Sequence, residues 1–247
     1  MSSLIPTYSA DQIITGLTEY LTTSFSLADH ATSEALEDFL RSEEHGIFRG
    51  PYIRCRLPYA PASDWKGVLE WLPEHFVPYQ HQAQAFRRLR SHVGGVDKRP
   101  DPTLVVTGTG SGKTEAFLYP ILDHARRERQ QGRGGMKALL LYPMNALAND
   151  QASRLAKLIA SDSRLAGITA GIYTGESGDN AARRMSEESL ISDRQTIRET
   201  PPDILLTNYK MLDQLLLRPE DRQIWQKSAT SLQYIVLDEF HTYDGAQ

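Results

Sequence analysis

The residues with the most specific chemistry form the run TGTGSGKT at positions 107–114, directly after an apolar run. Small residues let backbone N–H groups close around a β-phosphate, a lysine binds the β- and γ-phosphates, and a hydroxyl holds Mg²⁺. Thr107 replaces the first glycine of the GxxxxGK[ST] pattern, and the alternative is a chance glycine-rich turn. The GKT ending and the helical pattern after it favour a nucleoside-triphosphate site. Its expected residues are Thr107, Gly108, Thr109, Gly110, Ser111, Gly112, Lys113 and Thr114.

A second, acidic motif, Asp238-Glu239, ends the apolar run Tyr234–Leu237 and lies 125 residues after Lys113. An aspartate at the carboxyl end of a buried parallel strand, beside a phosphate loop, can hold the Mg²⁺ shell. The adjacent glutamate can polarise the attacking water as a general base. Surface carboxylates also occur at strand ends, so the combination with the phosphate loop is what is informative. Together the motifs predict Mg²⁺-dependent NTP hydrolysis, with Lys113, Asp238 and Glu239 catalytic and Thr114 and Asp238 as metal ligands.

These residues need a scaffold that brings them together, and from residue 100 onward the chain alternates short apolar runs with helical patterns. Short apolar runs are typical of parallel strands that are covered on both faces. Regular alternation of strands and helices predicts a parallel, doubly wound α/β sheet. Residues 175–202 are polar and charged, and we expect them to form an insertion with one short helix. The expected strands are Thr103–Thr107, Ala138–Tyr142, Thr169–Thr174, Ile204–Thr207 and Tyr234–Leu237.

Charge divides the chain near residue 75. Residues 1–75 hold 11 Asp/Glu and 5 Lys/Arg, whereas the rest holds 20 and 22, so charge alone predicts no nucleic-acid partner. The first part has the pattern of short helices and proline-rich loops, and it carries no motif with chemistry of its own. We therefore expect residues 1–75 to be a helical or irregular accessory region, and residues 76–247 to be the motif-bearing domain.

Composition excludes several classes of protein. Hydrophobic residues make up 40% of the chain and charged residues 23%, which is unlike a disordered or fibrous protein. The single Cys55 excludes an internal disulfide framework and a multi-cysteine zinc site within this sequence. No apolar stretch approaches 18 residues, and the first residues lack the pattern of a secretory signal. We expect a soluble, cytoplasmic protein without a membrane partner.

Six motifs in register resemble those of superfamily 2 DEAD/DEAH-box helicases. Asp238–His241, DEFH, resembles a DEAH-type box with Phe240 in place of the usual alanine, and TGTGSGKT resembles the family's first motif. The remaining similarities are Pro78–Gln82 to the Q motif, Leu139–Gln151 to motif Ia, Tyr173–Gly175 to motif Ib and Pro202–Leu212 to the TNxxML stretch. The resemblance covers residues 76–247. In detail the motifs are most similar to bacterial Lhr/YprA-like helicases and to helicases of anti-phage defence systems of the Druantia, DISARM and Dpd type.

The resemblance implies an ATP-binding, RecA-like P-loop domain in which Gln82 contacts adenine. An amide can donate to and accept from the adenine N7/N6 edge, whereas guanine presents the opposite pattern. The alternative for Gln82 is an exposed helix glutamine with no role. The resemblance also implies that the parallel sheet is incomplete at the C-terminus, because the strand of motif III and a second RecA-like domain with arginine fingers would follow. His241 would couple hydrolysis to nucleic-acid binding.

Further expected contacts lie where predicted strands end and helices begin. Backbone N–H groups at helix starts, with Asn and Thr side chains, can bind nucleic-acid phosphates without reading bases. Simple helix capping by Asn145 and Asn208 is the alternative, and both can hold together. The candidate nucleic-acid residues are Pro143, Asn145, Thr174, Gly175, Thr207 and Asn208.

Two functions are compatible with this sequence. The first is the ATP-binding part of a nucleic-acid-dependent ATPase that translocates on or unwinds DNA rather than RNA, with ATP and Mg²⁺ as cofactors. The second is a nucleotide-dependent binding or regulatory module that never turns over. In the first case the expected partners are DNA, the second RecA-like domain and other proteins of a defence system. This chain alone is then expected to be almost inactive.

Overall fold

The structure, a computed structural model, describes residues 6–49, 58–108, 110–175 and 181–243, so Thr109 and Cys55 lie outside the described residues. The chain divides into two compact units, residues 1–58 and residues 59–247. The first unit contains two helices that pack against each other, α1 (Pro6–Ser24) and α2 (His30–Arg41). Asp29 caps α2, because its carboxylate accepts the Thr32 N–H at 3.0 Å. Among the described residues, no helix combines the length and the apolar character needed to cross a membrane.

The second unit is built on a parallel sheet of four strands, as the sequence predicts. The strands are β3 (Ala138–Tyr142), β4 (Ala170–Tyr173), β5 (Ile204–Asn208) and β6 (Tyr234–Leu237), in the order β4-β5-β3-β6. Ala138 of β3 is in register with the first residue of β5 and the first residue of β6. All four strands therefore end at the same edge of the sheet, where the motif residues follow them.

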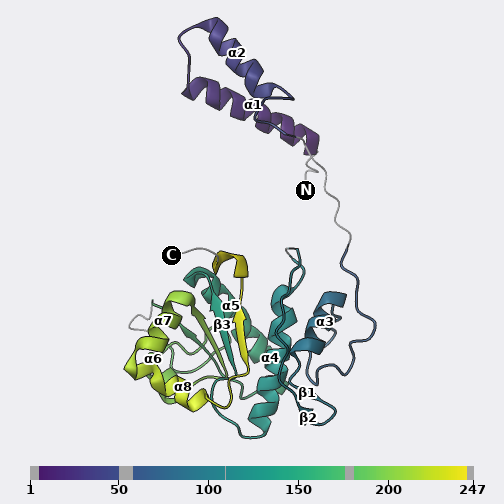
Figure 1. Cartoon of the computed structure of the whole chain (residues 1–247), viewed down its shortest axis with the longest axis vertical. Helices are drawn as coiled ribbons and strands as arrows, with labels where there is room; N and C mark the ends of the chain where they lie inside the picture. The colour runs from purple at the N-terminus through teal and green to yellow at the C-terminus, as the bar shows by residue number, and fades with distance from the viewer. Residues whose placement is uncertain (1–5, 50–57, 109, 176–180, 244–247) are drawn as a thin grey trace. The chain divides into compact units, whose positions relative to one another are not determined.

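Helices cover both faces of this sheet (Figure 1). The side chain of Leu140 belongs to the core under α3 (Gln80–Leu89), α4 (Lys113–Gln130) and α5 (Asn145–Ser161). The neighbouring side chain of Leu139 belongs to the opposite core, under α6 (Arg194–Glu199), α7 (Tyr209–Leu217) and α8 (Arg222–Ser228). This alternation is what a strand covered on both faces requires. The short elements are the hairpin β1 (His92–Val93) and β2 (Val96–Asp97), and the 3₁₀ turns η1 (Ser163–Leu165), η2 (Pro219–Asp221) and η3 (Phe240–Tyr243).

The expected strand Thr103–Thr107 does not form, and that prediction is wrong. These residues have no strand assignment, and the side chains of Leu104 and Val106 are 73% and 80% exposed. A strand exists only where a neighbour completes its hydrogen-bond ladder. β6 pairs with β3 on one side and is the last strand of the sheet, but residues 103–107 form no ladder with its free side. Local sequence pattern carries no information about whether a segment pairs with a strand that is distant in the sequence.

Residues 59–75, which precede the motifs, pack against the sheet unit. Trp71 is buried in its core, and its ring meets that of Tyr119 edge to face at 5.7 Å between centroids. The Trp71 backbone N–H donates to the Asp123 carboxylate of α4 at 2.7 Å, and its indole N–H donates to Asp162 at 2.9 Å. These long-range contacts fix the chain that leads into α3.

Candidate nucleotide-binding site

The phosphate loop leads directly into the N-terminus of α4, and glycine geometry makes this entry possible. Gly110 and Gly112 both have φ of +75°, a left-handed conformation that residues with a Cβ adopt at a cost. A Cβ at Gly112 would also lie 2.3 Å from the amide nitrogen of Gln82. α4 then begins at Lys113, with the unpaired N–H groups of its first turn at this end. A helix N-terminus of this kind binds phosphate through its N–H groups and its dipole.

Helix α3 holds the loop from outside. The side-chain amide of Gln82 donates to the Gly112 carbonyl at 2.9 Å and accepts the Tyr79 N–H at 2.9 Å. Gln82 is only 2% exposed, so it is not the exposed helix glutamine that was the alternative. His81 adds a second contact, with its Nε2 2.9 Å from the Ser111 carbonyl oxygen. His81 is a residue that sequence reasoning missed, although its place beside Gln82 was a usable signal.

An aromatic cluster of Tyr59, Tyr79 and His81 accompanies these contacts. The Tyr79 and His81 rings are stacked, with centroids 5.8 Å apart and an interplanar angle of 19°. Tyr59 meets each of them at 5.4 Å between centroids. Because His81 contacts the phosphate loop, the cluster lies beside the loop. Ring faces at this position are suited to stacking on a nucleobase.

Substitution of Gln82 by alanine is expected to weaken ATP binding about tenfold and to weaken GTP binding as well, because the loop loses a buried hydrogen bond at Gly112. Isothermal titration calorimetry with both nucleotides measures this. The matched control is Gln84→Ala, on the same helix but exposed. A loss confined to ATP would indicate an adenine contact alone, and no loss with either nucleotide would show that Gln82 does not support the loop.

The acidic motif follows β6 at the same edge of the sheet. The Asp238 N–H donates to the Leu141 carbonyl at 3.0 Å, which extends the ladder with β3. Burial raises the pKa of the Asp238 carboxyl, and the hydrogen bond from the Glu239 N–H at 3.0 Å lowers it. The Glu239 carboxylate raises this pKa and the Lys113 ammonium lowers it, both to a smaller extent. The Lys113 charge is thus near enough to act on Asp238, in keeping with the position of both motifs at the same edge of the sheet. Burial also raises the pKa of Tyr243 to about 12, with the Asp238 charge as the second cause.

Glu239 lies in an unusual backbone conformation. Its φ is +49°, which for a residue with a Cβ is a strained position of the kind found at functional sites. Its carboxylate is partly exposed and its Oε2 lies 3.5 Å from Nδ1 of His241. The structure thus joins the residue expected to act as general base to the residue expected to couple hydrolysis to nucleic acid.

The residues expected to contact nucleic acid also gather at this edge, with different exposure. Asn208 caps α7, since its Oδ1 accepts the Met211 N–H at 2.8 Å, and its Nδ2 donates to Oδ1 of Asn145. Asn145 does not cap α5. Thr207 is fully buried and its hydroxyl donates to the Tyr173 carbonyl at 2.6 Å, so its side chain links β5 to β4.

The other three residues expected to contact nucleic acid also differ in exposure. Pro143 is half-buried, Thr174 is buried and Gly175 is exposed. They follow β3 and β4, so the segments after these strands converge with the phosphate loop at one sheet edge. Open α/β sheets bind ligands at this edge.

The donor set fits a nucleotide with its metal. The Thr114 hydroxyl and the Asp238 carboxylate are oxygen ligands, which Mg²⁺ prefers, and Lys113 supplies a positive charge for phosphate oxygens. Thr114 and Lys113 are half-buried at the start of α4, so both remain accessible to a ligand. The described residues contain no cluster of three or more His, Cys, Asp or Glu suited to binding a metal by themselves. A Mg²⁺ ion held by Thr114 and Asp238 would complete its coordination with water or with oxygens of the nucleotide.

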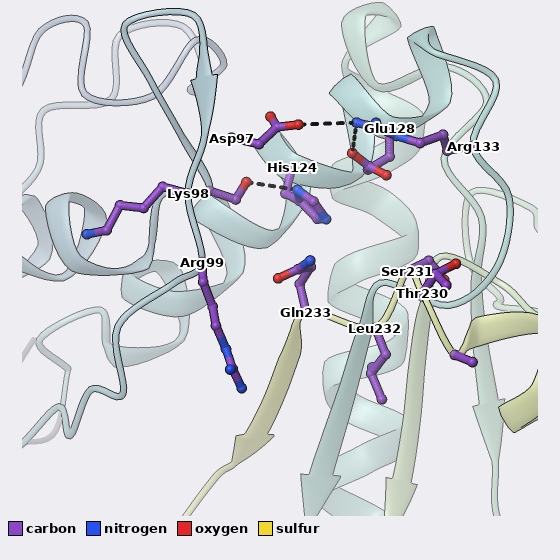
Figure 2. A pocket seen from close by; sticks show the side chains of 12 residues that line it. Asp97, Lys98, Arg99, His124, Glu128, Arg133, Thr230, Ser231, Leu232 and Gln233 are labelled. Atoms are coloured by element: carbon purple, nitrogen blue, oxygen red, sulfur yellow. Dashed lines mark hydrogen bonds and ion pairs between the residues drawn. The ribbon is translucent and has the colours of Figure 1, made fainter.

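A polar cavity of about 490 Å³ lies elsewhere, at the opposite edge of the sheet. Figure 2 shows that the strands run away from it, with Gln233 at the start of β6 on its wall and His124 of α4 facing it. Arg133 bridges the carboxylates of Asp97 and Glu128 on the far side. The nucleotide motifs contribute nothing to this cavity, so it is separate from the nucleotide site.

Several known helicases are similar to this chain. The uncharacterized ATP-dependent helicase YprA of Bacillus subtilis (strain 168) is 30% identical over 68% of this chain, and the Druantia protein DruE of Escherichia coli (strain UMEA 4076-1) is 25% identical over 93% of it. This chain spans 18% of the length of each of these relatives. The crystal structure of the DUF1998 helicase MrfA bound to DNA and AMPPNP is similar at 30% identity and a TM-score of 0.50, over 70% of this chain and 20% of that one. The family model described as DEAD/DEAH box helicase matches residues 79–247, more than half of the chain, and the chain therefore belongs to the DEAD/DEAH box helicase family.

Proposed function

We propose that residues 76–247 are the ATP-binding part of a nucleic-acid-dependent ATPase that translocates on or unwinds DNA. The observation that carries this proposal is that the phosphate loop at the start of α4 and the acidic pair after β6 lie at one edge of the sheet, where the Lys113 charge acts on the half-buried Asp238 carboxylate. Residues 1–75 are proposed as an accessory region. The alternative, a regulatory module that never turns over, shares the binding residues and differs only in turnover.

Each residue of the site has a separable role in this proposal. The N–H groups at the start of α4 and the Lys113 ammonium bind and orient the phosphates. Thr114 and Asp238 would hold Mg²⁺, which when bound neutralises charge on the phosphate oxygens. Glu239 would take a proton from the attacking water, and His241, 3.5 Å from its carboxylate, would transmit nucleic-acid binding to that base. Tyr59, Tyr79 and Gln82 are proposed to hold the adenine.

DNA is proposed as the substrate, with support from the DNA-bound structure of MrfA. Asn145, Thr174 and Asn208 lie at the strand ends and are proposed to bind backbone phosphates, together with Pro143, Gly175 and the backbone at Thr207. A second RecA-like domain is proposed as the partner that faces Lys113 across the nucleotide. Similarity to the Druantia protein DruE supports a role in a defence system with further protein partners.

A steady-state ATPase assay on residues 1–247, with and without single-stranded DNA, tests the proposal. We expect almost no turnover in either case, because an arginine finger contributes about 10³–10⁵ in rate and the second domain would supply it. DNA binding is expected to be weak and to fall steeply with salt. Joining the chain to the second domain should restore DNA-stimulated turnover if the proposal is right. Robust DNA-stimulated hydrolysis by residues 1–247 alone would contradict the proposed division of the site, and no turnover after restoration would favour the regulatory module.

A further inference from the structure

A second cavity, of about 380 Å³, lies far along α4 from the phosphate loop. Its wall includes Arg90, at the end of α3, and Arg127, near the end of α4. Gly94 and Gly95, in the turn between β1 and β2, border it without side chains. Asp123, also on this wall, is about 15 Å along the helix from Lys113 at 1.5 Å per residue, so the cavity is separate from the nucleotide site.

The two arginines bring unpaired donors to this cavity. Arg127 is 7% exposed, and its Nη2 donates to the Ser91 hydroxyl at 2.7 Å, but its Nε and Nη1 are buried with no acceptor among the described residues. Arg90 is half-buried, and its buried Nε likewise has no acceptor in the described part of the chain. A buried guanidinium that lacks acceptors is costly, and ordered water, an ion or another ligand normally satisfies it.

The acidic residues on the same wall do not satisfy these donors. The Glu70 carboxylate accepts from Arg126 at 2.9 Å, and Arg126 does not line the cavity. The Asp123 Oδ1 accepts the Trp71 N–H at 2.7 Å, and its Oδ2 is 3.9 Å from Arg127 Nη2, beyond hydrogen-bond distance. Burial raises the pKa of Asp123 to about 6, which is the opposite of what a close arginine partner would do.

Arg127 is held in place from behind by Ser91. The Ser91 Oγ accepts from Arg127 and lies 2.8 Å from Nδ1 of His124. Because that oxygen already accepts, its hydrogen is available to His124, whose ring faces the cavity of Figure 2. The hydroxyl thus connects the guanidinium to a buried ring. This arrangement occupies only the Nη2 of Arg127 and leaves its Nε and Nη1 donors for a ligand.

We propose that this second cavity binds a phosphate-type oxyanion between Arg90 and Arg127. Planar guanidinium groups match the oxygens of such an anion in paired, charge-assisted hydrogen bonds. The cavity is larger than a single phosphate and therefore has room for a bulkier ligand. The bound anion is either inorganic phosphate or the phosphate group of a small phosphomonoester. Both sources share the same chemistry at the two arginines.

The test is isothermal titration calorimetry on residues 1–247 in the Lys113→Ala background, which disables the phosphate loop and keeps the result independent of the proposed function. Inorganic phosphate and AMP are titrated separately at constant ionic strength, with chloride as the balancing anion. We expect phosphate-dependent heat that persists in this background, and Arg90→Gln to raise the Kd at least about tenfold through loss of charge-assisted bonds. Tighter binding of AMP would identify a phosphomonoester, and equal or weaker binding would identify the free ion.

The matched control is Arg222→Gln, an exposed arginine on α8, which should leave the Kd unchanged. Arg127→Lys is the second variant, because it keeps the charge but removes the Nε and Nη1 donors. Its thermal unfolding midpoint shows whether it folds, and if it does, binding should weaken as in Arg90→Gln. Absence of phosphate binding in the Lys113→Ala background would overturn the proposal. Equal affinities of Arg90→Gln and Arg222→Gln would overturn it too.

Discussion

Replacement of Lys113 by alanine is expected to lower the affinity for Mg·ATP about 100-fold, close to 3 kcal/mol, with the fold unchanged. Lys113 is the first residue of α4, directly after left-handed Gly112, and it is half-buried. Its ammonium is the positive charge that acts on the half-buried Asp238. Removal of that charge would leave Mg²⁺ as the remaining positive charge near Asp238 and the phosphates. A neutral side chain cannot replace a point charge on the β- and γ-phosphates.

Isothermal titration calorimetry with Mg·ATP measures the change, and thermal unfolding verifies the fold. Glu239→Gln is the matched control, because it alters the same cluster but removes only the proposed base. It should retain ATP binding, since neither phosphate nor metal depends on Glu239 in the proposed site. Wild-type affinity in Lys113→Ala would mean that this loop does not hold the triphosphate, whatever the family of the chain.

The sheet and its motif-bearing edge could be predicted because they depend on local patterns. β3 and β5 are short apolar runs, each followed by residues that start a helix. Parallel strands joined by helices must end at the same edge, so Asn208 and Asp238 could be placed together before any geometry was known. The glycines of the phosphate loop also predict the start of a helix from local sequence, because few residue types other than glycine tolerate the left-handed backbone conformation found there.

Features that depend on distant pairing could not be predicted. Thr103–Thr107 has a strand-like sequence, yet it pairs with no strand among the described residues. The contact between Gln82 and the Gly112 carbonyl joins residues 30 apart and supports the loop, a role that the sequence pattern did not predict. Neither the partner of a strand nor that of a buried amide can be inferred from composition or periodicity.

A buried ion pair between Lys137 and Asp203 was also missed, although the sequence holds a weak signal for it. A lysine directly precedes β3 and an aspartate directly precedes β5. Since Ala138 is in register with Ile204, these opposite charges face each other at 2.8 Å. Strand order had to be known first, because the same residues would be far apart in another arrangement.

Asp203→Asn is expected to destabilise the sheet unit by about 3–5 kcal/mol, because it leaves a buried cation without its partner. Both Lys137 and Asp203 are 0% exposed. The Asp203 carboxylate also accepts from Arg129 Nε at 2.7 and 2.9 Å, and from the N–H and hydroxyl of Thr169 at 2.8 and 2.9 Å. Asparagine preserves the size but not the charge, and its amide nitrogen would face donors.

Urea denaturation, followed by a probe of the sheet unit, measures this loss of free energy. The matched control is Asp213→Asn on α7, an exposed aspartate, which should change stability by less than about 0.5 kcal/mol. Lys137→Met combined with Asp203→Asn should recover part of the loss, because the uncompensated ammonium is then gone while its aliphatic volume is kept. If Asp203→Asn were as stable as Asp213→Asn, the ion pair would not hold β3 to β5. If instead the double variant lost more stability than Lys137→Met and Asp203→Asn lose together, the charge itself would not be the cause. The lost hydrogen bonds to Arg129 and Thr169 would then have to explain the effect.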